Sequence, residues 1–412
     1  MPRSTVMLIL PLLGIAACGR KPGEVVAGPE FQKSFQEALI QAKPGAVIEL
    51  PEGRQDVDRS FSLTVDNVTI RGKGINRTVL SFKNQKSGSA GLLVTSNQFT
   101  LEDVGFEDTK GDGIKVNGAT GVTFRRVRAE WTGGPNEKNG SYGLYPVQCK
   151  DVLIEESMVR GAADAGIYVG QSKNIIVRHN RAEGNVAGIE IENSQYADVY
   201  QNKAANNTGG ILVFNLPDLP VKGGQYTRVF DNEVVDNNTD NFAPKGNMVA
   251  TVPAGTGVIV MATNHIEVFK NRIRNNQTAN VSIISYLTTG KPVNDAGYDP
   301  FTEAIYVHDN TFAGGGDAPV GRIATALVPA FGKPLPAILY DGVVDPKRLT
   351  KGHLPDDARI CVQRNGDAAF ANYDAAGGAK HTDRTLAHYD CALPALTAVT
   401  IPAAGAGSAG GQ

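Results

Sequence analysis

Residues 166–213 read GIYVGQSKNIIVRHNRAEGNVAGIEIENSQYADVYQNKAANNTGGILV, and this stretch decides the fold. A glycine followed by alternating apolar residues begins at Gly166, at Gly188 and at Gly210, so the copies start 22 residues apart. Within a copy a second apolar pair follows, such as Ile175 with Val177, and then a polar turn. Alternation with a period of two is typical of β-strands. A repeat of this length fits one coil of three strands and is too short for a pair of helices.

The same unit recurs on both sides of this stretch. Further copies start at Gly91, Gly113, Gly143, Gly257 and, with asparagine in place of glycine, Asn280. Asparagines recur after the second strand, at Asn180, Asn202, Asn232, Asn271 and Asn310. Stacked asparagines can hydrogen-bond from coil to coil as a ladder. The sequence therefore predicts an all-β protein whose body is a right-handed parallel β-helix.

The N-terminus has the pattern of an export signal. The apolar run Val6–Leu13 is too short to span a bilayer and leads to Ile15-Ala16-Ala17-Cys18, which resembles a bacterial lipobox. We expect residues 1–17 to be a lipoprotein signal peptide and Cys18 to be lipidated. Because Gly19 is not aspartate, the chain is expected at the outer membrane, exported and lipid-anchored to the cell envelope.

The repeat region needs protection at its ends, since exposed strand edges invite aggregation. After a linker over 18–29, an amphipathic apolar spacing predicts an N-terminal capping helix within 30–42. The repeats fade after residue 312, so the β-helix with its cap is expected over 30–315. An irregular C-terminal region, rich in Pro and Gly, would follow over 316–395 as a second cap, and then a flexible tail over 396–412.

Cysteine usage and charge narrow the remaining possibilities. Cys361 and Cys391 can pair as a disulfide in an oxidising periplasm, which leaves Cys149 as a buried core thiol. The formal net charge is −2, which argues against a dedicated nucleic-acid binder. The histidines have no metal-ligand spacing, so no transition-metal site is expected.

The segments DAGIYVG (164–170) and DNFAPKG (240–246) resemble a family of bacterial parallel β-helix lipoproteins with the pectin-lyase fold. That family has no established activity, and its members are commonly encoded beside an exported protein similar to diheme c-type cytochromes. The resemblance therefore implies an envelope partner of that kind. The chain has no Cys-x-x-Cys-His and is not expected to carry covalent haem itself.

A more distant resemblance is to mannuronan C5-epimerases, which carry Asp-Pro-His-Asp on a β-helix strand. The similar position here reads Tyr145-Pro146-Val147-Gln148. The acid and the histidine that an epimerase would use are absent, and the sequence contains no other complete catalytic motif.

Alternate residues of the strand after each repeat glycine point away from the core. Because coils stack about 4.8 Å apart, residues far apart in sequence become neighbours in two outward columns. The predicted patch consists of Lys115, Tyr145, Tyr168, Glu190 and Glu192, with Asp164 at its edge. Tyrosine rings suit sugars, and three carboxylates, those of Asp164, Glu190 and Glu192, could hold Ca²⁺, the one cofactor considered. Further along, Leu212, Phe214 and Met261 make the same face apolar, and residues 216–225 could cover it.

Two functions fit these features. The leading hypothesis is a cell-envelope binding or scaffold protein whose patch recognises a partner exported protein or a glycan. The alternative is a polysaccharide-active enzyme, a lyase or hydrolase acting on an acidic polymer, with Lys115, Glu190 and Glu192 as weak catalytic candidates. The outward register further predicts that Glu190→Ala changes stability by less than about 0.5 kcal/mol and that the two patch tyrosines can be removed without loss of stability.

Overall fold

The computed structural model describes residues 23–402 of the 412-residue chain. The predicted signal peptide, the lipidation site Cys18 and residues 403–412 of the predicted tail lie outside the described residues. Within the described part, no helix is both long and apolar enough to cross a membrane.

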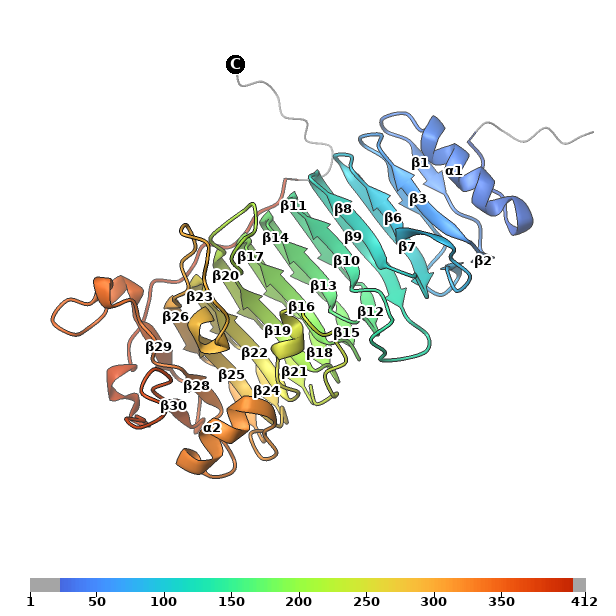
Figure 1. Ribbon diagram of the computed structural model, residues 1–412. Helices are drawn as coiled ribbons and strands as arrows, with labels where there is room; N and C mark the ends of the chain where they lie inside the picture. Colours follow the sequence, from blue (N-terminus) through green and yellow to red (C-terminus); the bar gives the residue numbers. More distant parts are fainter. Residues whose placement is uncertain (1–22, 403–412) are drawn as a thin grey trace, which may run out of the picture.

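The chain winds into an elongated stack of parallel coils (Figure 1). One face is an 11-stranded sheet, here sheet B, which contributes one strand to each coil. Its strands are β3 (Arg59–Leu63), β6 (Ser87–Val94), β8 (Asp112–Asn117), β10 (Tyr142–Val147), β13 (Ala165–Gly170), β16 (Ala187–Glu192), β19 (Gly209–Phe214), β22 (Thr256–Met261), β25 (Ala279–Ile284), β28 (Ile338–Tyr340) and β30 (Phe370–Asn372).

A 19-stranded sheet, here sheet A, supplies two further columns of strands. The first column is β1 (Val47–Glu49), β4 (Thr69–Arg71), β7 (Phe99–Glu107), β9 (Thr120–Glu130), β11 (Lys150–Glu155), β14 (Lys173–Arg178), β17 (Gln195–Tyr200), β20 (Gln225–Phe230), β23 (Asn264–Phe269), β26 (Glu303–His308) and β29 (Ile360–Gln363). The second is β2 (Gly53–Asp56), β5 (Thr78–Ser81), the far ends of β7 and β9, β12 (Met158–Arg160), β15 (Arg181–Glu183), β18 (Lys203–Ala205), β21 (Glu233–Val235), β24 (Arg272–Arg274) and β27 (Thr311–Ala313). These pairings confirm the predicted parallel β-helix.

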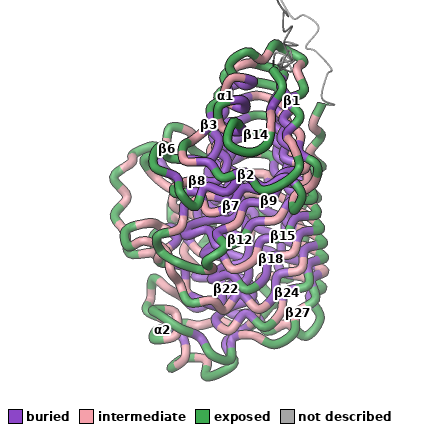
Figure 2. Tube along the Cα trace, turned by 90° about the vertical axis from the view of Figure 1, so that its right-hand side faces the viewer, coloured by how far each residue is buried: buried purple, intermediate pink, exposed green. Residues whose placement is uncertain are grey.

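The core runs along the inside of the stack (Figure 2). Ile167, Ile189 and Ile211 lie in register on adjacent strands of sheet B, and all three are fully buried. On sheet A, Ile175 of β14 points into the same core while its neighbour Ile176 is only half-buried. Because every coil contributes the same inward positions, the apolar repeat becomes one continuous core.

The predicted asparagine ladder is present. Asn202 Nδ2 donates to Asn232 Oδ1, and Asn232 Nδ2 donates to Asn271 Oδ1, each over 3.0 Å. The ladder starts at Asn180 and continues beyond the predicted members to Asn365. A second, unpredicted ladder joins Asn185, Asn207, Asn237 and Asn276 at the next corner. Both ladders satisfy buried backbone groups at the turns, where the chain leaves one strand for the next.

Helix α1 (Phe31–Gln41) caps the N-terminal end of the stack, as predicted. Its buried ring Phe35 lies 4.5 Å from the ring of Phe61 on β3, measured between centroids. The apolar face of the helix thereby covers the first coil.

The C-terminal boundary differs from the prediction. The coils do not end near residue 315, because β28, β29 and β30 continue both sheets through residue 372. Helix α2 (Gly321–Phe331) lies beside these last coils and buries Leu327 against Leu339. The expected irregular region is thus partly an extension of the β-helix.

The expected flexible tail is also revised. Cys391 forms the anticipated disulfide with Cys361 of β29, with an S–S distance of 2.00 Å, and Cys149 is a buried free thiol. Beyond Cys391, the backbone N–H groups of Leu396 and Val399 donate to carboxylates of the β-helix. Residues 396–402 are therefore not a free tail but lie on the stack.

Candidate functional site

The predicted outward columns of sheet B are in register residue by residue. Lys115 pairs with Tyr145, Tyr168 with Glu190, and Glu190 in turn with Leu212. In the neighbouring column Glu192 pairs with Phe214. The structure therefore brings the six predicted site residues to one area over β8, β10, β13 and β16, although 77 residues of sequence separate Lys115 from Glu192.

Three tyrosine rings meet at this site. The ring of Tyr142 lies 4.4 Å from that of Tyr145 and 4.5 Å from that of Tyr168, and the last two rings are 5.0 Å apart. Lys115 Nζ lies 4.6 Å from the centre of the Tyr145 ring, a cation–π contact. Tyr142 and Tyr145 are half-buried, while Tyr168 is buried. The site therefore opens to solvent over β8 and β10 and closes toward β13 and β16.

Carboxyl groups surround the rings. Tyr168 donates its hydroxyl to Glu192 Oε1 over 2.6 Å. Asp164 Oδ2 accepts from Asn247 Nδ2 over 3.1 Å. Asp164 Oδ1 and Glu190 Oε2 are buried without a hydrogen-bond partner. An ionised carboxylate in that condition costs several kcal/mol, so these groups favour the protonated form.

The electrostatics agree with that expectation. Burial, together with the charge of Glu192, raises the pKa of Asp164 to about 7. Burial and the charges of Asp164 and Glu192 raise the pKa of Glu190, and burial raises that of Glu192 against hydrogen bonds from Tyr168 and Glu190 that lower it. Asp112, at the open side, has its pKa raised to about 6 by burial against the opposing charge of Lys115. Carboxylic acids that keep a proton near neutral pH can donate hydrogen bonds as well as accept them.

The outward face of β13 and β16 is covered, which corrects the expectation of an exposed patch. Glu190 is only 2% exposed. Val249 and Val252 pack with Tyr168 and Leu212 into an apolar cluster outside the coils. Tyr168→Ala will therefore cost stability, and the expected near-neutral effect of Glu190→Ala loses its basis, because both side chains are buried under this cover.

The cover comes from segments other than the one predicted. Its buried members are Val249, Val252, Tyr286 and Tyr298, and residues 216–225 contribute the half-buried Leu216 at its edge. Tyr298 donates its hydroxyl to the buried carbonyl of Asn215 over 2.8 Å. The loops before β22 and after β25 thus close the apolar half of the face.

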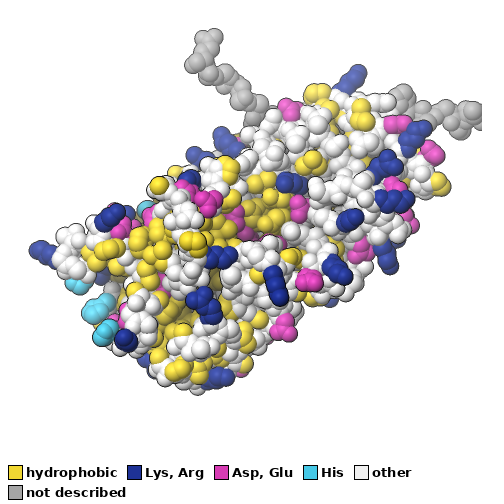
Figure 3. Space-filling view, viewed as in Figure 1, with side chains coloured by type: hydrophobic (Ala, Val, Ile, Leu, Met, Phe, Trp, Pro, Cys, Tyr) yellow, Lys and Arg dark blue, Asp and Glu magenta, His cyan; other side chains and the backbone are white. Residues whose placement is uncertain are grey.

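The open half remains visible at the surface. In the middle of the face drawn in Figure 3, hydrophobic side chains gather beside acidic and basic ones. Asp112, Lys115, Tyr142 and Tyr145 are only half-buried, and they make up the open half of the site. A ligand can therefore reach the two outer tyrosines without movement of the cover.

With the geometry established, comparison with known proteins identifies the architecture. Residues 57–226 match a family model described as a right handed beta helix region. This match agrees with the parallel coils, so the chain has a right-handed parallel β-helix fold. No curated protein shows significant sequence similarity to it.

Solved structures similar to this β-helix include polysaccharide-active enzymes. The A-module of mannuronan C-5 epimerase AlgE6 from Azotobacter vinelandii is 17% identical, with a TM-score of 0.49 over 84% of this chain and 92% of that chain. An alginate lyase from Paenibacillus sp. is 16% identical, with a TM-score of 0.37 over 70% of this chain and 97% of that chain. The periplasmic alginate epimerase AlgG is 14% identical, with a TM-score of 0.39 over 70% and 79%.

Sequence reasoning missed three members of the β-helix site. Asp112 and Tyr142 each stand one residue before a repeat glycine, and Asp112 Oδ1 accepts the backbone N–H of Tyr142 over 3.3 Å. The position directly before each repeat glycine forms a further column, and including that column in the predicted patch would have identified both residues. Asn247 comes from a loop outside the repeat, and no spacing signals it.

The calcium hypothesis receives no geometric support. Within residues 23–402 no group of three or more His, Cys, Asp or Glu side chains is arranged to hold a metal ion. The acidic side chains of the β-helix site instead contact tyrosine, asparagine and each other.

Proposed function

We propose that this β-helix protein binds a glycan at the open half of the site, over β8 and β10. The observation that carries the proposal is the meeting of three tyrosine rings beside Lys115, with Tyr142 and Tyr145 open to solvent. Tyrosine offers a sugar both an apolar ring and a hydroxyl, and it does so with little loss of side-chain entropy. The half-buried carboxyl group of Asp112, at the open side, supplies a hydrogen bond for a sugar hydroxyl.

The charge of the site favours a neutral glycan. Four carboxyl groups surround the rings, those of Asp112, Asp164, Glu190 and Glu192. The basic side chain of Lys115 contacts the ring of Tyr145. Asp112, with a pKa of about 6, is ionised at neutral pH, so a uronate would repel it and would raise the pKa values of the other three groups further, which costs free energy. The acidic polymer considered from the sequence is therefore the less suitable ligand.

Glycoside hydrolysis is the second candidate, and one observation favours it. The half-buried Asp112 has a pKa of about 6, which suits a general acid that protonates a leaving oxygen. A lyase on an acidic polymer is less well supported, because the charge of the site disfavours an acidic ligand. Release of reducing sugar from a bound neutral oligosaccharide, abolished by Asp112→Asn, would establish the hydrolase.

Tyr145→Ala should weaken binding of a neutral oligosaccharide, first identified on a glycan array, by at least tenfold in calorimetric titration. An aromatic anchor at a binding site typically contributes about 2 kcal/mol. Tyr196→Ala is the matched control, because Tyr196 is an exposed tyrosine on sheet A, outside the site. Equal affinity in wild type and Tyr145→Ala would remove the tyrosine cluster as the binding site.

We further propose that the β-helix is displayed at the cell envelope through lipid on Cys18, as the sequence pattern Ile15-Ala16-Ala17-Cys18 implies. Cys18→Ser should release the protein from the membrane fraction or block its processing. Membrane fractionation followed by immunoblotting measures this, with Cys149→Ser as the control cysteine. If the Cys18 variant stayed with membranes like the wild type, the anchor would be wrong. The exported partner similar to diheme c-type cytochromes remains an expectation of the family resemblance alone.

A further inference from the structure

The C-terminal segment lies across the first column of sheet A. From β29 it runs back along the stack, past β23 and β17 (Figure 1). The disulfide between Cys391 and Cys361 tethers its start. Leu396 N–H donates to Glu267 Oε2 on β23 over 3.2 Å, and Val399 N–H donates to Asp198 Oδ2 on β17 over 3.1 Å. We call residues 392–402 the strap.

The strap lies in a groove with a polar floor and aromatic sides. The floor is one outward column in register, from Asp198 through Arg228 and Glu267 to Tyr306. One side is a stack of Tyr196, Tyr226 and His265, with ring centroids 5.0 and 4.7 Å apart. The other side is a stack of Tyr200, Phe230, Phe269 and His308, with centroids 4.8, 4.9 and 5.2 Å apart.

The spacing of the groove matches an extended peptide. Asp198 and Glu267 lie two coils apart, which is about 9.6 Å at the usual strand separation. Leu396 and Val399 are three residues apart, which in a polyproline II chain spans about 9.3 Å. Leu393, Leu396 and Val399 are partly buried and the residues between them are exposed, so the strap shows the same three-residue period. The floor thus accepts one backbone N–H per turn of the peptide.

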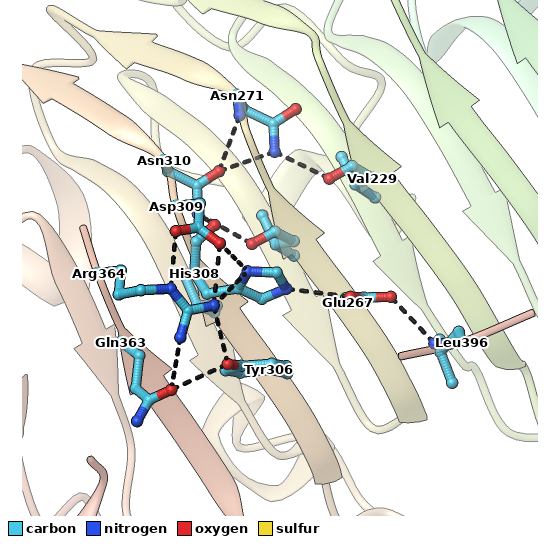
Figure 4. A network of polar contacts seen from close by, with 12 residues as sticks. Val229, Glu267, Asn271, Tyr306, His308, Asp309, Asn310, Gln363, Arg364 and Leu396 are labelled. Atoms are coloured by element: carbon cyan, nitrogen blue, oxygen red, sulfur yellow. Dashed lines mark hydrogen bonds and ion pairs between the residues drawn. The ribbon is translucent and has the colours of Figure 1, made fainter. Parts of the chain in front are cut away.

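The carboxylate acceptors are held in place from below. Glu267 Oε1 contacts His308 Nε2 at 3.0 Å, while its other oxygen faces the strap at Leu396 (Figure 4). Asp309 and Arg364 hold the far side of the His308 ring. Glu267 is therefore fixed in its orientation before any peptide is bound, which lowers the entropic cost of recognition.

With the strap bound, the groove still contains an unpaired hydrogen-bond acceptor and an unfilled cavity. Asp198 Oδ1 is buried without a hydrogen-bond partner. A cavity of about 440 Å³ remains between strap residues 393–397 and the aromatic side formed by Tyr196, Tyr226 and His265. Glu267 and Asp357 also line this cavity, and no lysine or arginine does. An extended peptide with a basic side chain in the cavity would make contacts that the strap leaves unmade.

We propose that this groove is a recognition site for an extended polypeptide segment with a basic side chain, and that the strap occupies it as a tethered, replaceable ligand. Aromatic-lined grooves that bind polyproline II segments are a known recognition mode. The proposal concerns sheet A and is independent of the glycan site on sheet B.

Amide hydrogen exchange on the intact chain tests the strap. The amides of Leu396 and Val399 should exchange at least tenfold more slowly than those of Ala395 and Ala398, which are exposed. Glu267→Ala should remove the protection at Leu396. Exchange of Leu396 and Val399 as fast as their neighbours in the wild type would overturn the groove as a peptide site.

Replacement is tested by adding synthetic peptides in excess of the tether's effective concentration, which is on the order of mM. One peptide has the sequence of residues 392–402, and a second carries Ala395→Lys. The Ala395→Lys peptide should abolish protection at Leu396 and Val399 at a concentration at least fivefold lower than the unmodified peptide. The ladder amides of Asn202 and Asn232 should stay protected as the control. Protection unaffected by both peptides, or lost only with a neutral oligosaccharide, would contradict the proposal.

Discussion

Ile175→Asp should prevent the protein from folding. Ile175 is fully buried on β14, in the core that every coil shares. An unpaired carboxylate at that position costs several kcal/mol, which is comparable with the whole stability of a typical domain. Circular dichroism and size-exclusion chromatography of the expressed variant should show loss of the β-sheet signal or aggregation.

The adjacent residue provides a matched control. Ile176 has the same side chain but points outward, in register with Asp198 on the next strand, and is half-buried. Ile176→Asn, which adds a polar group without a like charge beside Asp198, should cost no more than about 1 kcal/mol, as is usual away from the core. Similar damage from the two substitutions would mean that the register of β14 is wrong.

Asp164→Asn should make the protein more stable at neutral and alkaline pH. The pKa of Asp164 is raised from 3.8 to about 7, so between these values the folded protein holds a proton that the unfolded chain releases. Asp164 therefore lowers the stability of the wild type as pH rises from about 4 to about 7, and asparagine, which cannot ionise, removes this contribution. Since a tenfold change in proton affinity corresponds to about 1.4 kcal/mol, the variant should gain on the order of 4 kcal/mol at pH 8.

Denaturant unfolding at pH 4 and pH 8 measures this effect. The gain should be nearly absent at pH 4, because Asp164 is then protonated in the folded wild type. Asp367→Asn, at an exposed carboxylate, should leave the difference between the two pH values unchanged. Equal stability of the wild type and Asp164→Asn at pH 8 would contradict a buried protonated cluster.

The repeat made most of the fold predictable. Gly166, Gly188 and Gly210 start strands whose inward residues pair as their spacing requires, down to the register of Tyr168 with Glu190. Such regularity follows because each coil must place its apolar residues over those of the previous coil. The last strands of sheet B were not predicted, because β28 and β30 are three residues long and have no repeat glycine.

The covered half of the site could not be predicted from the repeat. Spacing shows which way Glu190 points but not that the segment with Asn247, Val249 and Val252 folds over it. The raised pKa of Glu190 follows from burial under that segment, so it could not be predicted from the repeat either. The strap shows the same limit, since Leu396 and Val399 reach acceptors 129 and 201 residues away. Contacts between a loop and the repeat do not recur at a fixed spacing, so the periodicity of the sequence cannot predict them.

The central claim is that a neutral glycan binds over β8 and β10. Hydrogen exchange of the full-length protein, with and without a saturating neutral oligosaccharide, tests it most directly because it locates the ligand. We expect new protection in peptides that contain Asp112, Lys115, Tyr142 and Tyr145, and none on sheet A. Protection confined to peptides that contain Tyr196 and Tyr226, with the tyrosine cluster of sheet B unchanged, would contradict it.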